Sequence, residues 1–364
     1  MEKLGVNAFG AAYRNRRVLV TGHTGFKGSW LCLWLSALGA NVTGLALDPP
    51  SAPCHWDLLG LPIEDHRVDI RDEAAVHSVL AAQQPEIVFH MAAQPLVRRS
   101  YHEPITTWAT NVMGTAHVLE AARHTGSVKA VVVVTTDKCY ENREWPWGYR
   151  ERDRLGGHDP YSASKAGAEL VTASYRSSFQ HDPGAPLLAS ARGGNVIGGG
   201  DWSEDRLIPD LVRSVTSGQP LVIRSPHATR PWQHVLDCLS GYLLVGQRLL
   251  AGERNSADAW NFGPGEHGNR QVEQVLNDIA RTLPSVRWEL ETTPQPHEAG
   301  LLQLDISKAT MLLRWRPVWN YESAVTQTAD WYRRWLNGGE VSSAEQLVAY
   351  LGDAVESGID WATA

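Results

Sequence analysis

The chain has 364 residues, 43% of them apolar and 15 of them tryptophan, which is enough for two domains or for one large α/β unit with an appended lobe. Its net charge of −7 and the lack of a basic tract argue against a protein that binds nucleic acid non-specifically. The cysteines show neither C-x-x-C spacing nor a disulfide-dense pattern, which indicates a reducing cytoplasm (Cys32, Cys54, Cys139 and Cys238).

The start of the chain and its longest apolar region give no sign of export or membrane insertion. No long apolar stretch precedes Arg14, so we expect no signal peptide. Residues 31–47 are interrupted by Gly39 and Asn41, which is typical of a helix followed by a strand rather than of a membrane span. We therefore expect a cytoplasmic protein that binds neither membranes nor nucleic acid, and we predict no metal site.

Short β-rich apolar runs alternate with helical stretches through the first half of the chain. Strands are predicted at residues 18–20, 42–47, 67–70, 87–90, 130–135 and 187–192, and helices at residues 28–38, 73–84, 107–125 and 161–179. Such alternation predicts right-handed crossovers and a parallel sheet that is buried on both faces. The continuous apolar run at residues 130–134 is typical of a central strand of that sheet.

The pattern of the sequence changes after about residue 193. Loops rich in glycine and proline, short helices and isolated strands such as residues 221–224 replace the regular alternation. We therefore predict an α/β protein with a doubly wound parallel sheet of the Rossmann type over residues 16–192. A smaller α/β substrate lobe is predicted mainly within residues 193–364, interleaved with the first domain, and residues 1–15 are predicted to be an N-terminal arm.

A glycine-rich turn follows the first predicted strand. Residues 17–21 (Arg-Val-Leu-Val-Thr) lead into Gly22, Gly25 and Gly28, where an apolar helical pattern begins. A strand that enters a helix through such a turn leaves backbone N–H groups at the helix N-terminus, where they bind pyrophosphate. Glycine is needed because a β-carbon would block the tight turn and the approach of the ligand. Three glycines at this spacing are by themselves weak evidence for a nucleotide site, but the strand–helix–strand pattern around them predicts a site that binds a dinucleotide.

The second strand of this unit ends at Asp48, which lies 48 − 28 = 20 residues after the last glycine of the turn. A carboxylate at this place can bind the hydroxyls of the adenosine ribose, and it would repel a 2′-phosphate. The predicted cofactor is therefore NAD rather than NADP. The alternative is that Asp48 only caps a loop before Pro49 and Pro50.

Tyr161 and Lys165 lie four residues apart in a predicted helix, one turn above the other on the same face. An ammonium beside a phenol stabilises the phenolate and lowers the tyrosine pKa from about 10. Together with the positive ring of an oxidised nicotinamide, the lysine could bring that pKa close to neutrality. The spacing is common on solvated helices, but beside a dinucleotide site it predicts that Tyr161 is a catalytic base supported by Lys165.

Four motifs occur in the order found in the extended short-chain dehydrogenase/reductase superfamily, and the chain resembles the sugar-nucleotide branch of that superfamily. They are residues 21–28 (Thr-Gly-His-Thr-Gly-Phe-Lys-Gly), 90–93 (His-Met-Ala-Ala), 111–115 (Asn-Val-Met-Gly-Thr) and 161–165 (Tyr-Ser-Ala-Ser-Lys). Further segments narrow the resemblance to the 4,6-dehydratases that act on CDP-glucose, namely residues 92–99, 135–140 (Thr-Thr-Asp-Lys-Cys-Tyr), 192–202, 206–209, 229–234 and 297–299. The resemblance covers residues 16 to about 335.

The resemblance implies dehydration of CDP-D-glucose to the 4-keto-6-deoxy sugar, with NAD regenerated in each cycle. Tyr161 would take the proton of the 4-hydroxyl while C4 gives up a hydride, water would leave across C5 and C6, and the hydride would return to C6. Thr136 would hydrogen-bond the 4-hydroxyl and Asp137 would be the acid at C6. Lys138, where related dehydratases usually have glutamate, would either stabilise the enolate or be the base at C5. The alternative is that Thr136 and Asp137 only cap the loop after their strand.

The resemblance also implies contacts with the cofactor and with the substrate. NAD contacts are expected from Gly22, Thr24, Gly25, Phe26, Lys27, Gly28, Asp48, Asp69, Ile70, Ala92, Ala93, Gln94, Asn111, Thr135, Tyr161 and Lys165. Contacts with the nucleotide sugar are expected from Gln94, Arg99, Asn195, Arg206, Arg230 and His297. Arginine suits a diphosphate because it binds oxygen pairs bidentately. The alternatives are surface arginines on a charged face and an ordinary loop histidine.

Two other functions remain open. A nucleotide-sugar 4-epimerase shares the cofactor, the tyrosine and the lysine but needs no acid at C6, so Asp137 and Lys138 argue against it. These two residues do not argue against a 4,6-dehydratase that acts on another nucleotide hexose. A non-catalytic NAD sensor on the same fold is the second alternative; the intact Tyr161 and Lys165 argue against that. The resemblance also implies a homodimer or larger homo-oligomer that pairs through residues 107–125 and 161–179, and a role in making deoxysugars such as those of O-antigen.

Overall fold

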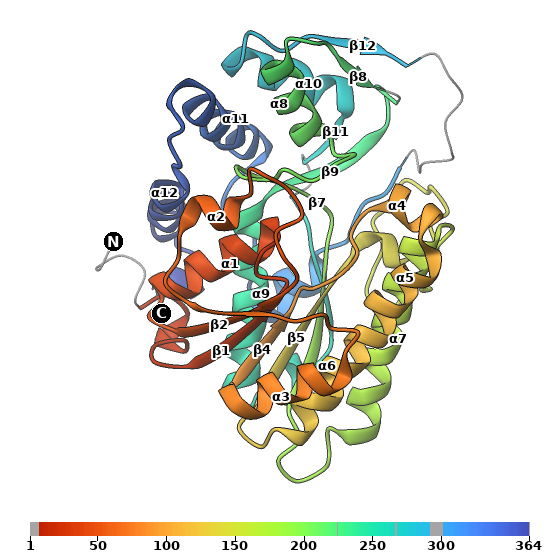
Figure 1. The fold of residues 1–364 in the computed structure, drawn as a ribbon, viewed down its shortest axis with the longest axis vertical. Coiled ribbons are helices and arrows are strands. Elements are labelled where there is room, and N and C mark those ends of the chain that lie inside the picture. Colours follow the sequence, from red (N-terminus) through yellow and green to blue (C-terminus); the bar gives the residue numbers. More distant parts are fainter. Residues whose placement is uncertain (1–6, 224, 266–267, 292–300, 364) are drawn as a thin grey trace.

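The computed structural model describes residues 7–223, 225–265, 268–291 and 301–363. Its centre is a seven-stranded sheet in the order β10-β6-β5-β4-β1-β2-β3 (Figure 1). The strands are β1 (Arg17–Thr21), β2 (Asn41–Ala46), β3 (Glu64–Arg67), β4 (Ile87–His90), β5 (Ala130–Thr136), β6 (Leu187–Gly193) and β10 (Ala259–Phe262). Every neighbouring pair in this sheet is parallel. The strand order reverses between β1 and β4, and sheets of this kind bind ligands at the carboxyl ends of the strands beside that reversal.

Helices cover both faces of the sheet, and alternate residues of a strand point to different apolar cores. Val18 and Val20 belong to the core under α1 (Phe26–Ala37) and α9 (Val235–Leu250). Leu19, between them, belongs to the core formed by α3 (Glu73–Gln83) and α6 (Gly114–His124), against which α7 (Pro160–Phe179) also packs. β5 is buried at all seven positions, as expected for a strand covered on both sides.

A second lobe lies above the carboxyl ends of the strands (Figure 1). It contains a three-stranded sheet of β7 (Asn195–Ile197), β9 (Thr229–His234) and β11 (Asn269–Gln271), and a pair of β8 (Leu221–Ile223) and β12 (Trp288–Leu290). Its helices are α8 (Leu207–Ser217), α10 (Val272–Thr282) and α11 (Tyr321–Gly338). The chain crosses between the lobes more than once, because α9 and β10 follow residue 193, and yet α9 packs against the main sheet and β10 is one of its strands.

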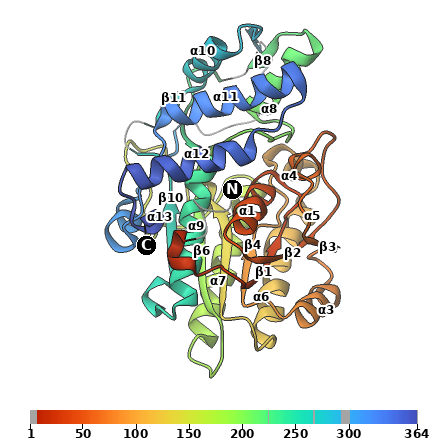
Figure 2. The same cartoon turned by 90° about the vertical axis from the view of Figure 1, so that its left-hand side faces the viewer.

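The C-terminal helices α12 (Ser343–Glu356) and α13 (Asp360–Thr363) run back along the α1 side of the sheet (Figure 2). There Trp361 stacks on Phe9 with ring centres 4.7 Å apart. The remaining elements are η1 (Ala8–Ala11), α2 (His55–Leu59), α4 (Val97–His102), α5 (Pro104–Trp108), η2 (Ala109–Met113), η3 (Asp137–Cys139), η4 (Arg254–Ser256) and η5 (Ala309–Leu313). In the described part of the chain, no helix combines the length and the apolarity needed to cross a membrane.

Two predicted elements differ from the structure. The strand predicted at residues 67–70 is wrong. β3 ends at Arg67, and Ile70 lies in the loop that follows, with its side chain buried against Gly114. The charged residues of this edge strand pair with β2 alone, so apolarity does not mark it. The helix predicted at residues 107–125 begins earlier, at Pro104, and contains one π-helical turn at Ala109–Met113.

Candidate active site

The glycine-rich turn follows the end of β1 and contacts the loop after β4. Gly22 has a φ of +75°, in the left-handed region that favours glycine, and a β-carbon there would lie 2.7 Å from the backbone nitrogen of Ala92. A β-carbon at Gly28 would lie 2.1 Å from the carbonyl oxygen of Gly22, so α1 packs directly onto the turn. Gly25 is the N-cap of α1 and offers no side chain to the first N–H groups of the helix. These residues fit a dinucleotide, because those N–H groups can bind its pyrophosphate.

A buried chain of hydrogen bonds fixes the loop that carries Ala92 and Ala93. The Thr21 hydroxyl accepts from the backbone N–H of Ala92 at 3.1 Å and lies 2.8 Å from Nδ1 of His90. Nε2 of His90 lies 3.0 Å from the Thr115 hydroxyl. Burial lowers the pKa of His90 to about 3, so its ring is neutral at physiological pH. The loop whose Ala92 and Ala93 are predicted to contact NAD is thus held by uncharged groups.

Tyr161 and Lys165 lie at the buried start of α7. The Asp159 carboxylate caps this helix by accepting from the backbone N–H of Ser162 at 2.9 Å. Tyr161 is 8% exposed and Lys165 is 6% exposed. The Lys165 ammonium donates to the Val134 carbonyl of β5 at 3.0 Å. The cap and this contact together set the position of the first two turns of α7 against the sheet.

The ionisation of this pair differs from the expectation. Burial raises the pKa of Tyr161 to about 12, although the charge of Arg206 acts in the opposite direction. Burial, together with the charge of Lys27, lowers the pKa of Lys165 to about 8. The expected lowering of the Tyr161 pKa by Lys165 is therefore wrong for the protein by itself. The reason is that burial dominates, and that the lysine Nζ donates to the Val134 carbonyl.

The Tyr161 hydroxyl and the Asp137 carboxylate meet at one threonine. The hydroxyl of Thr136, the last residue of β5, donates to Oδ1 of Asp137 at 2.9 Å, and Thr136 is close enough to Tyr161 to lower its pKa. Asp137 is 2% exposed, and a β-carbon at Gly194 would lie 3.6 Å from its Oδ2. Thr136 also accepts from the backbone N–H of Lys138 at 3.4 Å, so its capping role coexists with this cluster. The phenol, the hydroxyl and the carboxylate form one cluster of groups able to exchange protons, drawn from α7, the end of β5 and the start of η3.

Behind this cluster, a buried ion pair ties α7 to the sheet. The Glu169 carboxylate accepts from Thr135 at 2.5 Å, from Ser190 at 2.7 Å and from Arg192 at 2.7 Å. Arg192 also donates to the Tyr140 hydroxyl at 2.7 Å. Burial raises the pKa of Glu169, but Arg192 and the hydroxyl donors outweigh it and hold that pKa below its ordinary value. Thr135, predicted to contact NAD, has its hydroxyl engaged in this network.

The residues predicted to hold the adenosine half of the cofactor lie after β2 and β3. The Asp48 side chain is 91% exposed, and its carboxylate lies 3.8 Å from Nε of Arg67. Asp69 accepts from the guanidinium of Arg71 at 2.5 Å, and Ile70 is 4% exposed. These side chains therefore lie at the same end of the sheet as the glycine-rich turn.

Asn111, in the π-helical turn, joins two parts of the predicted cofactor site. Its amide donates to the Ser164 hydroxyl of α7 at 2.8 Å and accepts from the backbone N–H of Gln94 at 2.8 Å. The Gln94 side chain donates to the Thr107 hydroxyl at 2.9 Å and accepts from the backbone N–H of Leu96 at 2.6 Å. The predicted contact of Gln94 with cofactor or substrate would require these side-chain bonds to break.

Three of the residues predicted to bind substrate lie in the second lobe. Asn195 begins β7, and Arg230, which is 6% exposed, lies in the neighbouring strand β9. Arg206 is the N-cap of α8, ion-pairs with Asp201 at 3.3 Å and is close enough to Tyr161 to affect its pKa. Arg206 therefore carries positive charge from this lobe toward the acid–base cluster.

The other two predicted substrate residues are less informative. Arg99 ion-pairs with Glu103 at 3.2 Å along the helical segment that starts at α4, so its charge is already matched. His297 lies outside the described residues. Within the described ranges, no group of three or more histidine, cysteine, aspartate or glutamate residues is arranged to hold a metal ion.

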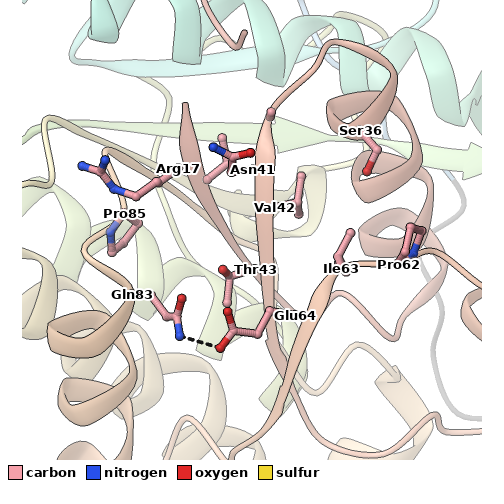
Figure 3. A pocket seen from close by; sticks show the side chains of 12 residues that line it. Arg17, Ser36, Asn41, Val42, Thr43, Pro62, Ile63, Glu64, Gln83 and Pro85 are labelled. Atoms are coloured by element: carbon pink, nitrogen blue, oxygen red, sulfur yellow. Dashed lines mark hydrogen bonds between the residues drawn. The ribbon is translucent and has the colours of Figure 1, made fainter. Parts of the chain in front are cut away.

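A hollow of about 520 Å³ lies at the opposite edge of the sheet. Figure 3 shows its lining, which includes Arg17 at the start of β1, Asn41 at the start of β2, and Gln83, whose amide donates to Glu64 at 2.6 Å. Ligands of open parallel α/β sheets bind at the carboxyl ends of the strands, whereas this hollow lies at the amino ends. The hollow is therefore not part of the acid–base site.

The family model described as GDP-mannose 4,6 dehydratase matches residues 19–328 of the chain. The chain belongs to this family. A similar curated relative is the CDP-glucose 4,6-dehydratase of Salmonella typhimurium, which is 49% identical over 351 residues, with 93% of this chain and 97% of the relative covered. The dTDP-glucose 4,6-dehydratase of Xanthomonas campestris is 28% identical over 349 residues, covering 88% of this chain and 95% of that protein.

Solved structures similar to this dehydratase-family chain include two NAD complexes. The UDP-glucose 4-epimerase of Thermus thermophilus has a TM-score of 0.75 and 27% identity, covering 87% of this chain and 99% of that one. DesIV, a dTDP-glucose 4,6-dehydratase of Streptomyces venezuelae with NAD and TYD bound, has a TM-score of 0.74 and 27% identity, covering 87% and 97%. The predicted superfamily branch and the Rossmann-type parallel sheet are confirmed, and NAD, the predicted cofactor, is present in both structures.

One residue that shapes the site of this dehydratase-family protein was not among the predicted functional residues. Glu169 follows Lys165 by four residues, so the helical period places both on one face of α7, and that spacing is the signal from which Glu169 could be predicted. Its partner Arg192 lies in β6, and only the fold brings them together. Lys27, predicted as a cofactor contact, has a second effect that no local pattern reveals, because its charge acts on the pKa of Lys165.

Proposed function

We propose that this protein is a hydro-lyase that dehydrates CDP-D-glucose to CDP-4-keto-6-deoxy-D-glucose, with NAD as a cofactor regenerated in each cycle. The observation that carries the proposal is the grouping of Tyr161, Thr136 and Asp137 at the carboxyl end of β5, where Thr136 donates to Asp137 and lies close enough to Tyr161 to affect its pKa. Oxidation at C4 followed by loss of the C6 hydroxyl requires a base and a carboxylic acid that both reach the same sugar ring. The choice of CDP-glucose is supported by the relative that is 49% identical along nearly the whole chain.

The residues of the glycine-rich turn would hold the cofactor pyrophosphate, and Asp48 its adenosine ribose. When bound, NAD supplies the hydride acceptor for C4, the donor for C6, and a positive charge that favours the phenolate of Tyr161. The buried ammonium of Lys165 is a second positive charge on the same face of α7. These two charges would oppose the effect of burial on the Tyr161 pKa.

Each acid–base step can then be assigned to a side chain. Tyr161 takes the proton of the 4-hydroxyl, with the Thr136 hydroxyl hydrogen-bonded to the same oxygen. The 4-ketone acidifies the proton on C5, which leaves as Asp137 protonates the departing C6 hydroxyl as water. Lys138 either stabilises the enolate formed at C5 or, as a neutral amine, removes that proton. The hydride then returns to C6, and the base that took the C5 proton gives a proton back to C5, which completes the 4-keto-6-deoxy sugar.

The diphosphate of the substrate would lie against Arg206 and Arg230, and the sugar near Asn195, with a further contact from His297. Two guanidinium groups suit a diphosphate through bidentate hydrogen bonds. Arg206 supports this placement, because its charge reaches Tyr161 from the second lobe. The substrate would then lie between the acid–base cluster and β7–β9, with residues 16–192 as the NAD domain and the substrate lobe mainly in residues 193–364.

We also infer a cytoplasmic homodimer that pairs through the helical segment 104–124 and α7, which lie side by side on one flank of the sheet (Figure 1). Large apolar side chains are exposed on these helices, whereas most large apolar side chains of the protein are buried. Ile105 is 80% exposed, Leu170 61% and Met113 52%, and a second subunit could cover them. A protein with Ile105→Glu should be smaller in light scattering than the wild type. If the wild type is itself a monomer, this proposal is wrong.

A nucleotide-sugar 4-epimerase is the second candidate, because such an enzyme from Thermus thermophilus shares this fold at 27% identity. An epimerase returns the hydride to C4 and needs no acid at C6. The test is incubation with CDP-, dTDP-, UDP- and GDP-glucose, followed by NMR of the products. A 4-keto-6-deoxy sugar from CDP-glucose supports the proposal, whereas a C4 epimer contradicts it. If the 4-keto-6-deoxy product forms from dTDP-, UDP- or GDP-glucose instead, the proposed reaction stands but the nucleotide of the substrate is a different one.

A single substitution separates the steps. Asp137→Asn removes the proposed C6 acid but leaves Tyr161 intact, so C4 oxidation should continue while elimination slows by about 10²-fold or more. NADH absorbance should therefore accumulate when this variant is mixed with substrate. Tyr161→Phe is the control, in which no NADH should form. If Asp137→Asn turns over like the wild type, the C6 acid is another residue.

A further inference from the structure

Arg67 lies beside the carboxylate that is predicted to bind the adenosine ribose. It is the last residue of β3 and pairs in register with Ala46, the last residue of β2. Nε of Arg67 lies 3.8 Å from the carboxylate of Asp48, just beyond the end of β2. The end of β2 is where a dinucleotide fold distinguishes a ribose hydroxyl from a 2′-phosphate, and arginine is the residue that accommodates the phosphate.

The guanidinium of Arg67 is fixed by contacts on its other side. One nitrogen donates to the Asp65 carboxylate at 2.6 Å, and another donates to the Leu47 carbonyl at 3.0 Å. The same carbonyl accepts from the Thr24 hydroxyl of the glycine-rich turn at 3.0 Å. Arg67 is thereby connected to the turn that would hold the pyrophosphate, and its position does not depend on Asp48.

The Asp65 carboxylate is itself oriented by the buried side chain of His23. Nε2 of His23 lies 2.9 Å from one Asp65 oxygen, and the other oxygen accepts from Arg67. The His23 ring is fully buried, edge-on to Trp56 at 4.6 Å, and a β-carbon at Gly44 would lie 2.5 Å from it. His23, Asp65 and Arg67 thus form a supported chain that reaches from the glycine-rich turn to the ribose position.

Asp48 differs from this chain in being weakly held. Its side chain is 91% exposed, and the contact with Arg67 at 3.8 Å is longer than a hydrogen bond. Asp48, Asp65 and Arg67 together carry a net charge of −1, which opposes a phosphate of about −1.5 to −2. Without Asp48 the net charge is zero, and the guanidinium, which has five N–H donors, has more of them than its bonds to Asp65 and Leu47 use.

We propose that Arg67 is a preformed binding group for a cofactor 2′-phosphate, and that the Asp48 carboxylate is what prevents NADP from using it. The proposal rests on the proposed NAD site and deepens it, because it assigns the choice between the two cofactors to two named side chains. NAD selectivity is then a property of one exposed carboxylate. The arginine beside it favours the other cofactor.

The test is the dissociation constants of NAD and NADP, measured by calorimetry on four proteins: wild type, Asp48→Ser, Arg67→Gln and the double variant. Asp48→Ser should bind NADP about 10- to 100-fold more tightly than the wild type does, the range expected for charged hydrogen bonds. The double variant should lose most of that gain. Arg16→Gln, which removes a surface ion pair at the amino end of β1, is the matched control and should change neither constant.

The adenosine end is tested separately with 2′,5′-ADP and ADP as competitors, since neither carries a nicotinamide. In Asp48→Ser, 2′,5′-ADP should bind more tightly than ADP, the difference should shrink with added salt and it should vanish with Arg67→Gln. The proposal is overturned if Asp48→Ser gains no NADP affinity, or if the double variant keeps the gain. A wild type that binds neither NAD nor NADP would instead overturn the proposed function and with it the basis of this inference.

Discussion

Thr135 and Thr136 are consecutive residues of β5, yet they serve two different regions of the molecule. Because side chains alternate along a strand, Thr135 points to the Glu169–Arg192 ion pair and Thr136 points to Tyr161. In the first region the Glu169 carboxylate accepts three hydrogen bonds from side chains. The strand therefore has one side that faces the buried ion pair and one side that faces the proposed acid–base cluster.

The comparison shows how a buried carboxylate can be recognised as structural or reactive. The charge of Glu169 is compensated by Arg192 and by hydroxyl donors, so nothing further is needed for its burial. Asp137 is equally buried, but in the described part of the chain its carboxylate accepts one hydrogen bond, from the Thr136 hydroxyl. The number of partners, rather than the depth of burial, therefore separates the structural carboxylate from the one proposed to react.

The largest expected effect in the reactive region is that of Tyr161→Phe. Loss of the hydroxyl removes the base at C4, and turnover should fall by about 10²- to 10⁴-fold. NAD affinity should stay near that of the wild type, as measured by calorimetry. Tyr175→Phe, on the same helix with its hydroxyl 3.1 Å from Glu120, is the control and should turn over normally. Undiminished turnover of Tyr161→Phe would refute the assigned base.

The largest expected effect in the structural region is that of Glu169→Ala. Removal of one partner leaves the Arg192 charge buried without compensation, which should lower the free energy of unfolding by about 3 to 5 kcal/mol in a denaturant titration. Glu120→Ala removes a more exposed carboxylate that pairs with Arg123, and should cost about 1 kcal/mol or less. Equal losses for the two variants would mean that the ion pair is not the distinct support described here.

Valine substitutions at the two threonines test the comparison most directly. Thr135→Val removes a hydrogen bond to the Glu169 carboxylate, which should cost about 1.5 to 3 kcal/mol of stability while leaving turnover close to normal. Thr136→Val should cost only about 0.5 to 1 kcal/mol of stability but lower turnover by about tenfold, because its hydroxyl donates to Asp137 and is proposed to bind the 4-hydroxyl of the sugar. Thermal unfolding and steady-state kinetics measure both. The reverse assignment of effects would contradict the division of β5 into two sides.

The smallest expected effect concerns Lys165, which lies between the two regions. Its pKa of about 8 in the folded protein is below the ordinary 10.5, so between these values the unfolded chain binds more protons than the folded one. The stability contributed by this group therefore rises with pH, by about 1 kcal/mol from pH 8 to pH 9. Lys165→Met should lose this rise, whereas Lys129→Met, at an exposed lysine, should keep it. Parallel pH profiles for all three proteins would show that the pKa of Lys165 is not lowered.

Residues close together in sequence were predictable, and those joined by the fold were not. The glycine-rich turn, the pair Tyr161 and Lys165 and the segment after β5 follow from fixed local spacings. The pKa of Tyr161 was not predictable, because the burial of its side chain and the direction of the Lys165 ammonium are tertiary properties. The ion pair of Glu169 with Arg192 likewise joins a helix to a strand.

The position of β3 illustrates the same limit and its cause. Residues 68–70 are more apolar than Glu64–Arg67, so periodicity favours the wrong segment. The edge of the sheet needs no apolar strand, because β3 pairs on one side only and its residues are largely exposed. The link between Arg67 and Asp48 depends on this register and could not be read from the sequence.

The composition of β3 has a consequence for how the protein behaves at high concentration. An outer strand presents unpaired backbone groups that can recruit a strand from another molecule. The short edge strand carries four polar side chains, those of Glu64, Asp65, His66 and Arg67. Charged side chains on an edge strand discourage edge-to-edge pairing with the sheet of another molecule. Arg67, which is proposed to take part in the choice between NAD and NADP, therefore also belongs to a strand whose charges oppose aggregation through the β3 edge of the sheet.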